Sequence, residues 1–179
     1  MRYGIYFCFD PETEKRLQSL RERLASDIPG LPSITGKMRP HLTLLVFNGS
    51  DLSEIQQLFA AYAESVSRFA ITLQQINVFQ GRNHVVYAEP SPSQMLQQQF
   101  ISCQQHFPHY VFPSTYSDAA HWHPHVTLAK GMDLQSFQMA LTLAKQLWHP
   151  LEALISNIGL INLQKPLDVL AERQLTGCT

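Results

Sequence analysis

The chain is arranged around one segment, which reads His121-Trp122-His123-Pro124-His125-Val126-Thr127-Leu128. Its last four residues form a His-x-Thr-Leu tetrad, and a second tetrad of the same pattern occurs upstream at His41–Leu44. A proline directly precedes each tetrad. Because successive side chains of a β-strand alternate between its two faces, each tetrad places a histidine and a threonine on one face and two aliphatic residues on the other. Each tetrad therefore predicts a strand with one reactive polar face and one buried face.

The elements around the two tetrads follow the same order. Caps and apolar periodicity predict a helix before each tetrad, then a helix and two strands after it. Asp51 and Asp133 occupy matching positions and are expected to cap the helices that follow the tetrads. This order indicates an internal repeat. The expected strands are 3–9, 41–47, 70–79, 84–89, 125–129, 153–163 and 167–174, and the expected helices begin at Pro11, after Ser50 or Asp51, at Ser91-Pro92 and after Asp133.

The repeat predicts an α+β fold of two similar lobes related by a pseudo-two-fold axis. Each lobe is expected to hold an antiparallel sheet and two helices, with the active site in a cleft between the lobes. We interpret residues 1–179 as one domain, in which about 1–90 form the first repeat unit and about 91–179 the second, with strands free to exchange between lobes. Such an axis would face His41 toward His125.

Composition and charge limit the classes of function. With 45% hydrophobic and 15% charged residues, the chain fits a globular core rather than a disordered segment. A net charge of −1 argues against the broad basic surface that grips a long nucleic-acid backbone. We therefore expect the partner to be an RNA terminus or a small cyclic nucleotide.

The cysteines and the apolar segments favour a location in the cytoplasm. Cys8, Cys103 and Cys178 are odd in number and far apart, which is typical of free thiols in a reducing compartment. The amino terminus lacks the pattern of a signal peptide, and no run of residues has the length of a membrane span. We expect a cytoplasmic monomer with no contact to a membrane.

Two facing histidines suit the cleavage of a phosphate ester. An unperturbed imidazole has a pKa of about 6.5, so one ring can take a proton from water while the other gives one to the leaving oxygen. The hydroxyl groups of Thr43 and Thr127 can donate hydrogen bonds to the non-bridging phosphate oxygens. His41, His125, Thr43 and Thr127 are therefore the candidate site residues, and this set calls for no metal and no cofactor.

The paired tetrads and the segment His41-Leu-Thr-Leu-Leu-Val-Phe-Asn-Gly49 resemble the 2H phosphoesterase superfamily. Within it, the chain looks most like the group of bacterial 2′-5′ RNA ligases and RNA 2′,3′-cyclic phosphodiesterases. The resemblance implies a bilobal α+β fold and metal-independent hydrolysis of a cyclic phosphodiester to a phosphomonoester. Reversible 2′-5′ RNA ligation is a further activity that the same site could support, but it does not follow from the family name. It also implies that His41 is the general acid toward the leaving oxygen and His125 the general base toward water. Many relatives carry an arginine shortly after the second tetrad, where this chain has Lys130.

Four further residues are candidates for substrate binding. Arg39 lies two residues before His41 and would point to the same face of an extended chain, and Lys130 follows the second tetrad. Either cation can therefore reach a phosphate. A solvated loop charge is the alternative for Arg39. Tyr116 and Trp122 precede the second tetrad in a predicted loop and can stack on a nucleobase.

Two other functions stay open. His121, His123 and His125 alternate and can form a zinc or iron ligand set, which would make the protein a metal-dependent hydrolase. Pro124 interrupts that strand, and no acidic motif completes the set. The second alternative is a non-catalytic module that binds RNA ends, although the chain lacks the basic stripe and the aromatic motif of an RNA-recognition domain.

Overall fold

The computed structural model describes residues 1–34, 38–80, 84–164 and 166–178, and the side chain of Cys178 lies outside what it describes. The helices are α1 (Pro11–Asp27), α2 (Leu52–Ser65), α3 (Gln94–His106) and α4 (Leu134–Leu147), with a 3-10 turn, η1 (Ser114–Tyr116). The strands are β1 (Arg2–Phe9), β2 (His41–Asn48), β3 (Ser67–Phe79), β4 (Val85–Pro90), β5 (Val126–Ala129), β6 (Leu151–Asn162), β7 (Asp168–Gln174) and β8 (Thr176–Cys178).

The helices begin at capping residues, and the aspartates among them were predicted. Asp10 accepts hydrogen bonds from the backbone N–H groups of Glu12 and Thr13, and Asp51 and Asp133 cap α2 and α4 in the same way. The prediction for α3 is wrong by two residues, because Ser93 is the N-cap. Ser91 instead donates its backbone N–H to the carbonyl of Thr72 at 2.8 Å, which holds it against the sheet. The short strand β8, which runs parallel to β3, was not predicted.

The main sheet has the order β2-β1-β6-β3-β4-β5, and its neighbouring strands are antiparallel. Each tetrad strand lies at one end of this order, since β2 pairs with β1 and β5 pairs with β4. The long strand β6 pairs with β1 through its second half and with β3 through its first half. The equivalent strands of the two repeat units are β1 and β4, β2 and β5, and β3 and β6. When each strand is replaced by its equivalent, the order of the sheet is simply reversed, so the sheet has the symmetry expected of a repeat. The α+β class with an antiparallel sheet is confirmed.

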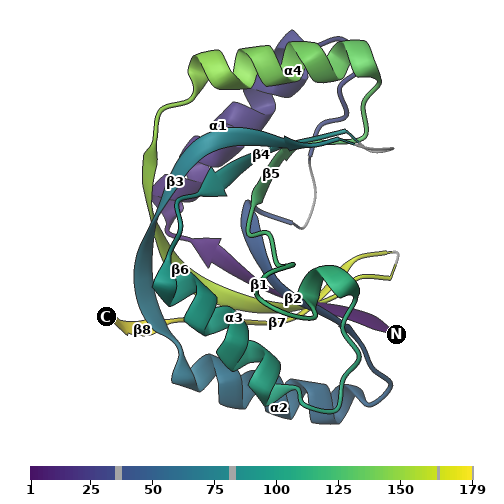
Figure 1. The fold of residues 1–179 in the computed structure, drawn as a ribbon, viewed down its shortest axis with the longest axis vertical. Helices are drawn as coiled ribbons and strands as arrows, with labels where there is room; N and C mark the ends of the chain where they lie inside the picture. The colour runs from purple at the N-terminus through teal and green to yellow at the C-terminus, as the bar shows by residue number, and fades with distance from the viewer. Residues whose placement is uncertain (35–37, 81–83, 165, 179) are drawn as a thin grey trace.

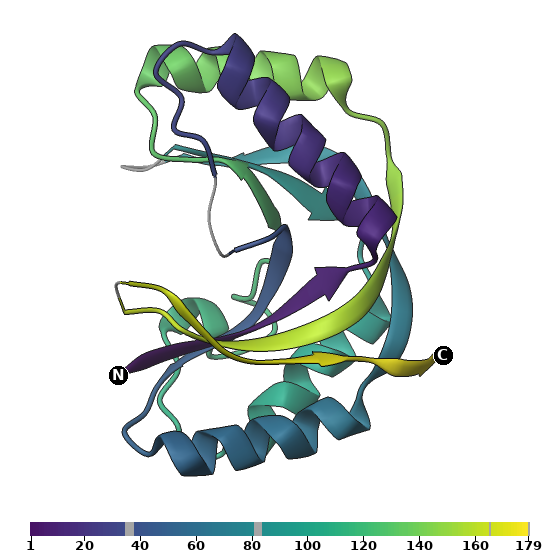
Figure 2. The same cartoon turned by 180° about the vertical axis from the view of Figure 1, so that it is seen from behind.

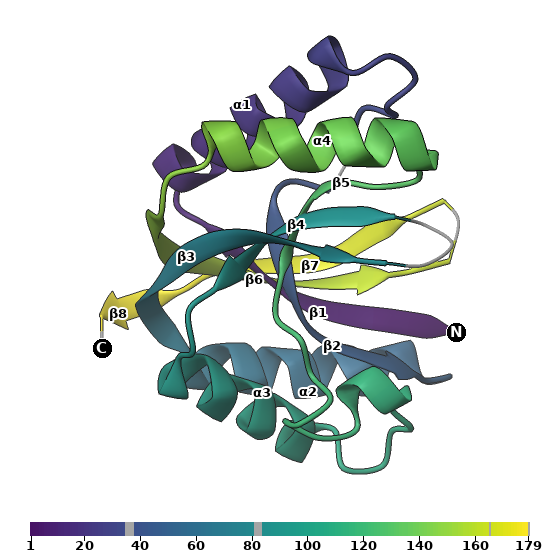
Figure 3. The same ribbon diagram turned by 45° about the horizontal axis from the view of Figure 1, so that its top comes forward.

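The helices cover the sheet as two pairs at opposite ends of the molecule. α1 lies beside α4, and α2 lies beside α3 (Figures 1 and 2). α1 precedes β2 in the chain but contacts β5, whereas α3 precedes β5 but contacts β2. Figure 3 shows the two pairs on either side of the strands. Each repeat unit therefore places its first helix beside the tetrad strand of the other unit.

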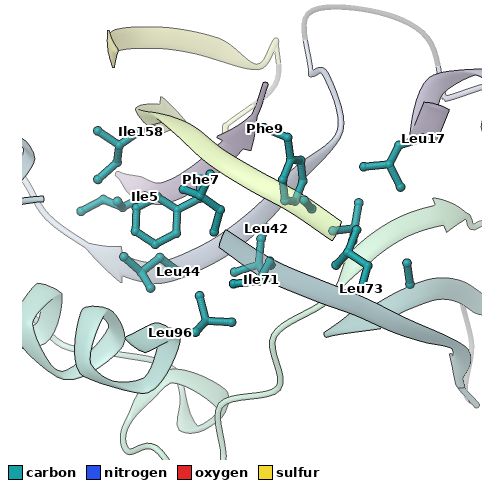
Figure 4. Packing of buried hydrophobic residues seen from close by; sticks show 14 of the residues in the cluster. Ile5, Phe7, Phe9, Leu17, Leu42, Leu44, Ile71, Leu73, Leu96 and Ile158 are labelled. Carbon is teal, nitrogen blue, oxygen red and sulfur yellow. The ribbon is translucent and has the colours of Figure 1, made fainter. Parts of the chain in front are cut away.

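The two faces of β1 separate the core from a second, smaller cluster. Ile5 and Phe7 are completely buried and lie close to Leu42 and Leu44 of β2 (Figure 4). On the other face of β1, Tyr6 and Cys8 form a small buried cluster with Ile161. The polar residues of the first tetrad lie on this second face.

Candidate active site

Both tetrads show the alternation predicted for them. Leu42 and Leu44 in the first tetrad, and Val126 and Leu128 in the second, are at most 1% exposed. The histidines and threonines of both tetrads are half-buried. The strands that bury two aliphatic side chains therefore hold an imidazole and a hydroxyl on the opposite face.

The two imidazoles are held in the same way. The Nδ1 atom of His41 lies 2.8 Å from the carbonyl oxygen of Arg39, and Nδ1 of His125 lies 2.8 Å from the carbonyl oxygen of His123. A carbonyl only accepts, so each ring carries its proton on Nδ1 when neutral. The two prolines help to fix these carbonyls, because Arg39 and His123 each precede a proline and such a residue is restricted to extended conformations. Neither Nε2 has a hydrogen-bond partner among the described residues, so both are left for chemistry.

A tyrosine lies opposite each tetrad threonine on the neighbouring strand. Tyr6 pairs with Thr43 and Tyr87 pairs with Thr127. The ring centroid of Tyr6 lies 5.6 Å from that of His41, and the centroid of Tyr87 lies 5.2 Å from that of His125. Tyr6 extends across Gly159 of β6, where any larger side chain would overlap its phenol ring. Each catalytic candidate thus packs against a tyrosine ring of the sheet, and His125 also packs against Phe79 of β3, with ring centroids 4.9 Å apart.

The residues before the two prolines are anchored by carboxylates. The guanidinium of Arg39 lies 3.2 Å from Glu14 on α1 and 3.0 Å from Glu172 on β7. The Nε2 atom of His123 lies 2.9 Å from Glu89 on β4 and 2.8 Å from the hydroxyl of Tyr87. Because the carbonyls of Arg39 and His123 hold the two imidazoles, these anchors fix the rings indirectly.

The carbonyl of each tetrad threonine accepts a hydrogen bond from a distant side chain. The indole of Trp122 donates to the carbonyl of Thr43 at 3.3 Å. The buried Arg21 of α1 donates from Nε and Nη2 to the carbonyl of Thr127 at 3.0 and 2.7 Å. Tyr116 lies near the side chain of Thr43, which acts to lower the pKa of the Tyr116 phenol against the larger effect of burial, which raises it. The segment before the second tetrad therefore contacts the first tetrad directly.

The electrostatic environment keeps the imidazoles neutral in the free protein. Burial, with smaller contributions from Arg21, His125 and Lys130, lowers the pKa of His41 to about 4, and the bond to the Arg39 carbonyl opposes this shift. Burial also lowers the pKa of His125, and the charge of His123 acts in the same direction. Burial lowers the pKa of Arg21 to about 10, so Arg21 is still a cation at neutral pH. An anion placed among these groups would stabilise a protonated imidazole.

The comparison with protein families decides the identification. The model of the 2′-5′ RNA ligase superfamily matches residues 9–166 of the chain. The chain belongs to the 2′-5′ RNA ligase superfamily. This match confirms the resemblance to the 2H phosphoesterases that the tetrads indicated. Membership supports a phosphoesterase function in RNA processing.

Solved structures share the fold over nearly the whole chain. They include a phosphoesterase at 16% identity, with a TM-score of 0.59 and coverage of 98% of this chain and 99% of that one. Escherichia coli LigT in complex with 3′-AMP has 14% identity, a TM-score of 0.59 and coverage of 98% of both chains. Kluyveromyces marxianus Usb1 has 8% identity, a TM-score of 0.58 and coverage of 94% of this chain and 97% of that one. No curated protein sequence matches the chain. Among the described residues, no helix is long and apolar enough to cross a membrane.

Within this 2′-5′ RNA ligase superfamily fold, the other predicted binding residues have different surroundings. Lys130 is exposed, and its charge lowers the pKa of His41, so it lies near the site. Arg39 is occupied by its two glutamate partners, which favours an anchoring role. Tyr116 contacts Thr43. Trp122 is only 7% exposed and stacks on Phe100 with ring centroids 4.5 Å apart, which favours packing over stacking on a base. Their roles in substrate binding stay predictions.

The side-chain geometry gives no support to the metal-dependent alternative. His121 is exposed and pairs with Asp118 at 2.9 Å, whereas His123 pairs with Glu89. His125 uses Nδ1 to hold the carbonyl of His123. In the part of the chain that the structure describes, no group of three or more His, Cys, Asp or Glu side chains is placed to hold a metal ion.

Sequence reasoning missed Tyr6, Tyr87 and Arg21 of the candidate site, as well as the carboxylates that anchor Arg39 and His123. Tyr6 and Tyr87 occupy matching positions of the repeat, like the predicted pair Pro11 and Pro92, and this match could have identified them. Arg21 lies between Leu17 and Leu24 on the apolar stripe of α1. Because a charged side chain is rarely buried without a partner, a charge at such a position indicates a specific buried contact.

Proposed function

We propose that the protein is a metal-independent cyclic phosphodiesterase with a paired-histidine site. Its substrate is a 2′,3′-cyclic phosphate, on an RNA end or a small nucleotide, and its product is a 2′-phosphomonoester. Reversible 2′-5′ RNA ligation is a second activity of the same site. The observation that carries the proposal is the matched pair of imidazoles, each held through Nδ1 and each with Nε2 unpaired among the described residues.

The reaction needs one base, one acid and stabilisation of phosphoryl charge. Nε2 of His125 takes a proton from water while the water oxygen forms a bond to phosphorus. The bond from phosphorus to the ribose O3′ breaks, and that oxygen receives the proton from Nε2 of His41. The hydroxyls of Thr43 and Thr127 donate to the non-bridging oxygens. Binding of the anionic substrate favours the protonated form of the acid, which burial and the neighbouring cations disfavour in the free protein.

The solved structures with the same fold support a nucleotide substrate. LigT has been solved in complex with 3′-AMP, and Usb1 with uridine monophosphate. The chain's net charge of −1 supports a ligand with few phosphates, because a long backbone would require more cations.

The test measures hydrolysis of nucleoside 2′,3′-cyclic phosphates by the wild type and by alanine variants of each histidine. Loss of either His41 or His125 should lower turnover ~10²–10⁴-fold, which is the usual contribution of general acid–base catalysis. The double variant should lose less than the product of the two single losses, because the residues act as a unit. His109→Ala, at an exposed site on another segment, is the control. Activity that EDTA abolishes and Zn²⁺ restores would overturn the proposal, and RNA binding without turnover would favour the non-catalytic module.

A further inference from the structure

We propose that a pocket beside His123 binds the base of the nucleoside that carries the cyclic phosphate. The proposal rests on the proposed function and adds a binding site to it. The pocket has a volume of about 440 Å³ and lies between strands β3 and β4, the start of α3, and the segment 119–124. Figures 1 and 3 show these elements next to one another.

The pocket begins one residue from the imidazole of His125. His123 and Pro124 are part of its wall. The carbonyl of His123 holds Nδ1 of His125, and the peptide bond joins Pro124 to His125. Glu89 is also in the wall and pairs with His123. The tetrad residues do not line the pocket, but its wall includes the residue whose carbonyl positions the imidazole of His125, so a group bound against His123 lies beside the support of that ring.

The wall excludes a phosphate and suits a neutral group. None of the residues that line the pocket, all within the described ranges, is a lysine or an arginine. Although burial raises the pKa of Glu89, hydrogen bonds from Gln75 and Asn77 lower it, so its carboxylate is ionised at neutral pH. An anion would be repelled by this carboxylate, and His123, the basic side chain of the wall, is already paired with Glu89 at 2.9 Å.

The wall has the apolar surfaces and polar edges that a nucleobase requires. Pro92 provides exposed apolar surface, and the small exposed parts of Trp122 and Leu96, 7% and 2%, extend it. Trp122 is fixed by its stacking on Phe100, so this part of the wall is rigid. Gln74 and Gln97 add side-chain amides, which both donate and accept hydrogen bonds. Since either amide can rotate to present a donor or an acceptor, we expect the four bases to differ by less than ~10-fold in kcat/KM.

The size of the pocket limits what it can hold. Small-molecule sites in proteins occupy about 300–1,000 Å³, and this pocket of about 440 Å³ is near the lower end. It has room for one base and its sugar. A chain of several nucleotides would extend outside it.

The experiment fills the pocket and compares substrates with and without a base. Gln97→Trp adds a large side chain to the wall, and Gln98→Trp places the same side chain next to it on α3, outside the pocket. Both glutamines are exposed, so neither change disturbs the core. The probes are adenosine 2′,3′-cyclic phosphate and D-ribose 2,3-cyclic phosphate. In Gln97→Trp, the ratio of kcat/KM for the nucleoside to kcat/KM for the ribose should fall roughly 10- to 100-fold, the value of one base contact. Gln98→Trp should keep the wild-type ratio.

A second variant and a third probe separate the other outcomes. Ala119→Phe fills the pocket from a different segment and provides the test if Gln97→Trp unfolds. An unchanged ratio in a folded pocket variant would overturn the proposal. The third probe is a dinucleotide that ends in a 2′,3′-cyclic phosphate. If a pocket variant lost activity on this dinucleotide but not on adenosine 2′,3′-cyclic phosphate, the proposal would also fail, because the pocket would then hold the preceding base. A wild-type protein that hydrolyses neither probe would instead overturn the proposed function.

Discussion

At the scale of single residues, the two histidines combine identical hydrogen bonding with different electrostatics. Both donate from Nδ1 to the second carbonyl upstream. Burial, the cations Arg21 and Lys130, and the second imidazole of His125 lower the pKa of His41 to about 4, a large change from the ordinary value of 6.5. His41 is therefore hard to protonate before substrate binds. In the role of general acid, it acquires its proton together with the anionic substrate.

The lowered pKa of His41 predicts how stability depends on pH. Between pH 6.5 and about 4 the unfolded chain binds a proton at this position and the folded chain does not. The free energy of unfolding should therefore fall as pH falls through this window. His41→Asn removes this contribution, so its melting temperature should fall less than that of the wild type between pH 7 and pH 5. His109→Asn, at an exposed site, is the control. An equal fall in His41→Asn and the wild type would contradict the prediction.

The threonine of the second tetrad should act on the reaction rather than on the fold. Thr127→Val keeps the β-branched shape and removes the hydroxyl. Turnover should fall ~10²-fold, as for the loss of one donor to a developing oxyanion, while the melting temperature changes by only a few degrees. Thr72→Val, a change of the same type on β3, serves as the control. A folded Thr127→Val enzyme with full activity would show that the hydroxyl has no catalytic role.

At the scale of elements, the site depends on contacts that join different strands and helices. The positions of His41 and Thr43 on their strand were predictable from alternation alone. Their partners were not predictable in this way, because Tyr6 reaches Thr43 only through the pairing of β1 with β2. A single sequence does not state which strands are neighbours. The capping aspartates were predictable because a cap and its helix are consecutive in sequence.

The contact between Glu89 and His123 should affect catalysis through the position of His125. Glu89→Gln weakens the pairing that holds His123, whose carbonyl orients His125. We expect kcat to fall ~10-fold through misplacement of the ring, with little change in KM. The limb of the pH profile that belongs to His125 should also move, because the charge of His123 contributes to its pKa. Glu152→Gln, which removes an exposed carboxylate bonded to Thr72, is the control. A loss of stability with an unchanged pH profile would leave Glu89 with a structural role only.

At the scale of the whole molecule, the repeat units are interlocked. The sequence predicts two units, but it does not show that α1 of the first unit packs beside β5 of the second. The helices of both units present similar apolar faces, so the sequence pattern fits either arrangement. The observed order instead makes β6 of the second unit the shared neighbour of β1 and β3 of the first.

This arrangement predicts that neither repeat unit folds alone. A fragment of residues 1–90 lacks β6, and in the intact sheet β1 and β3 each pair with β6 rather than with each other. Circular dichroism should show each separate fragment, 1–90 or 91–179, to be largely unfolded. Mixing the two should restore the secondary structure and the hydrolysis of cyclic phosphates. An isolated fragment 1–90 that unfolds cooperatively as a monomer would show that the units are independent lobes.

The matched bonds from Nδ1 to backbone carbonyls have a consequence for the direction of the reaction. By microscopic reversibility, the group that removes a proton in one direction must return it in the other. In both rings Nδ1 is taken up by a backbone carbonyl, so Nε2 is the nitrogen that remains for proton transfer in either direction, and exchanging roles would require no ring flip. Under the proposed function, one base would activate either water or a ribose hydroxyl and one acid would protonate the same leaving oxygen, so hydrolysis and ligation use the same roles, and the roles exchange only when the 2′-5′ linkage is cleaved back to the cyclic phosphate. We therefore expect the relative concentrations of water and of RNA ends, rather than a rearrangement of the protein, to decide which of the two proposed reactions is observed.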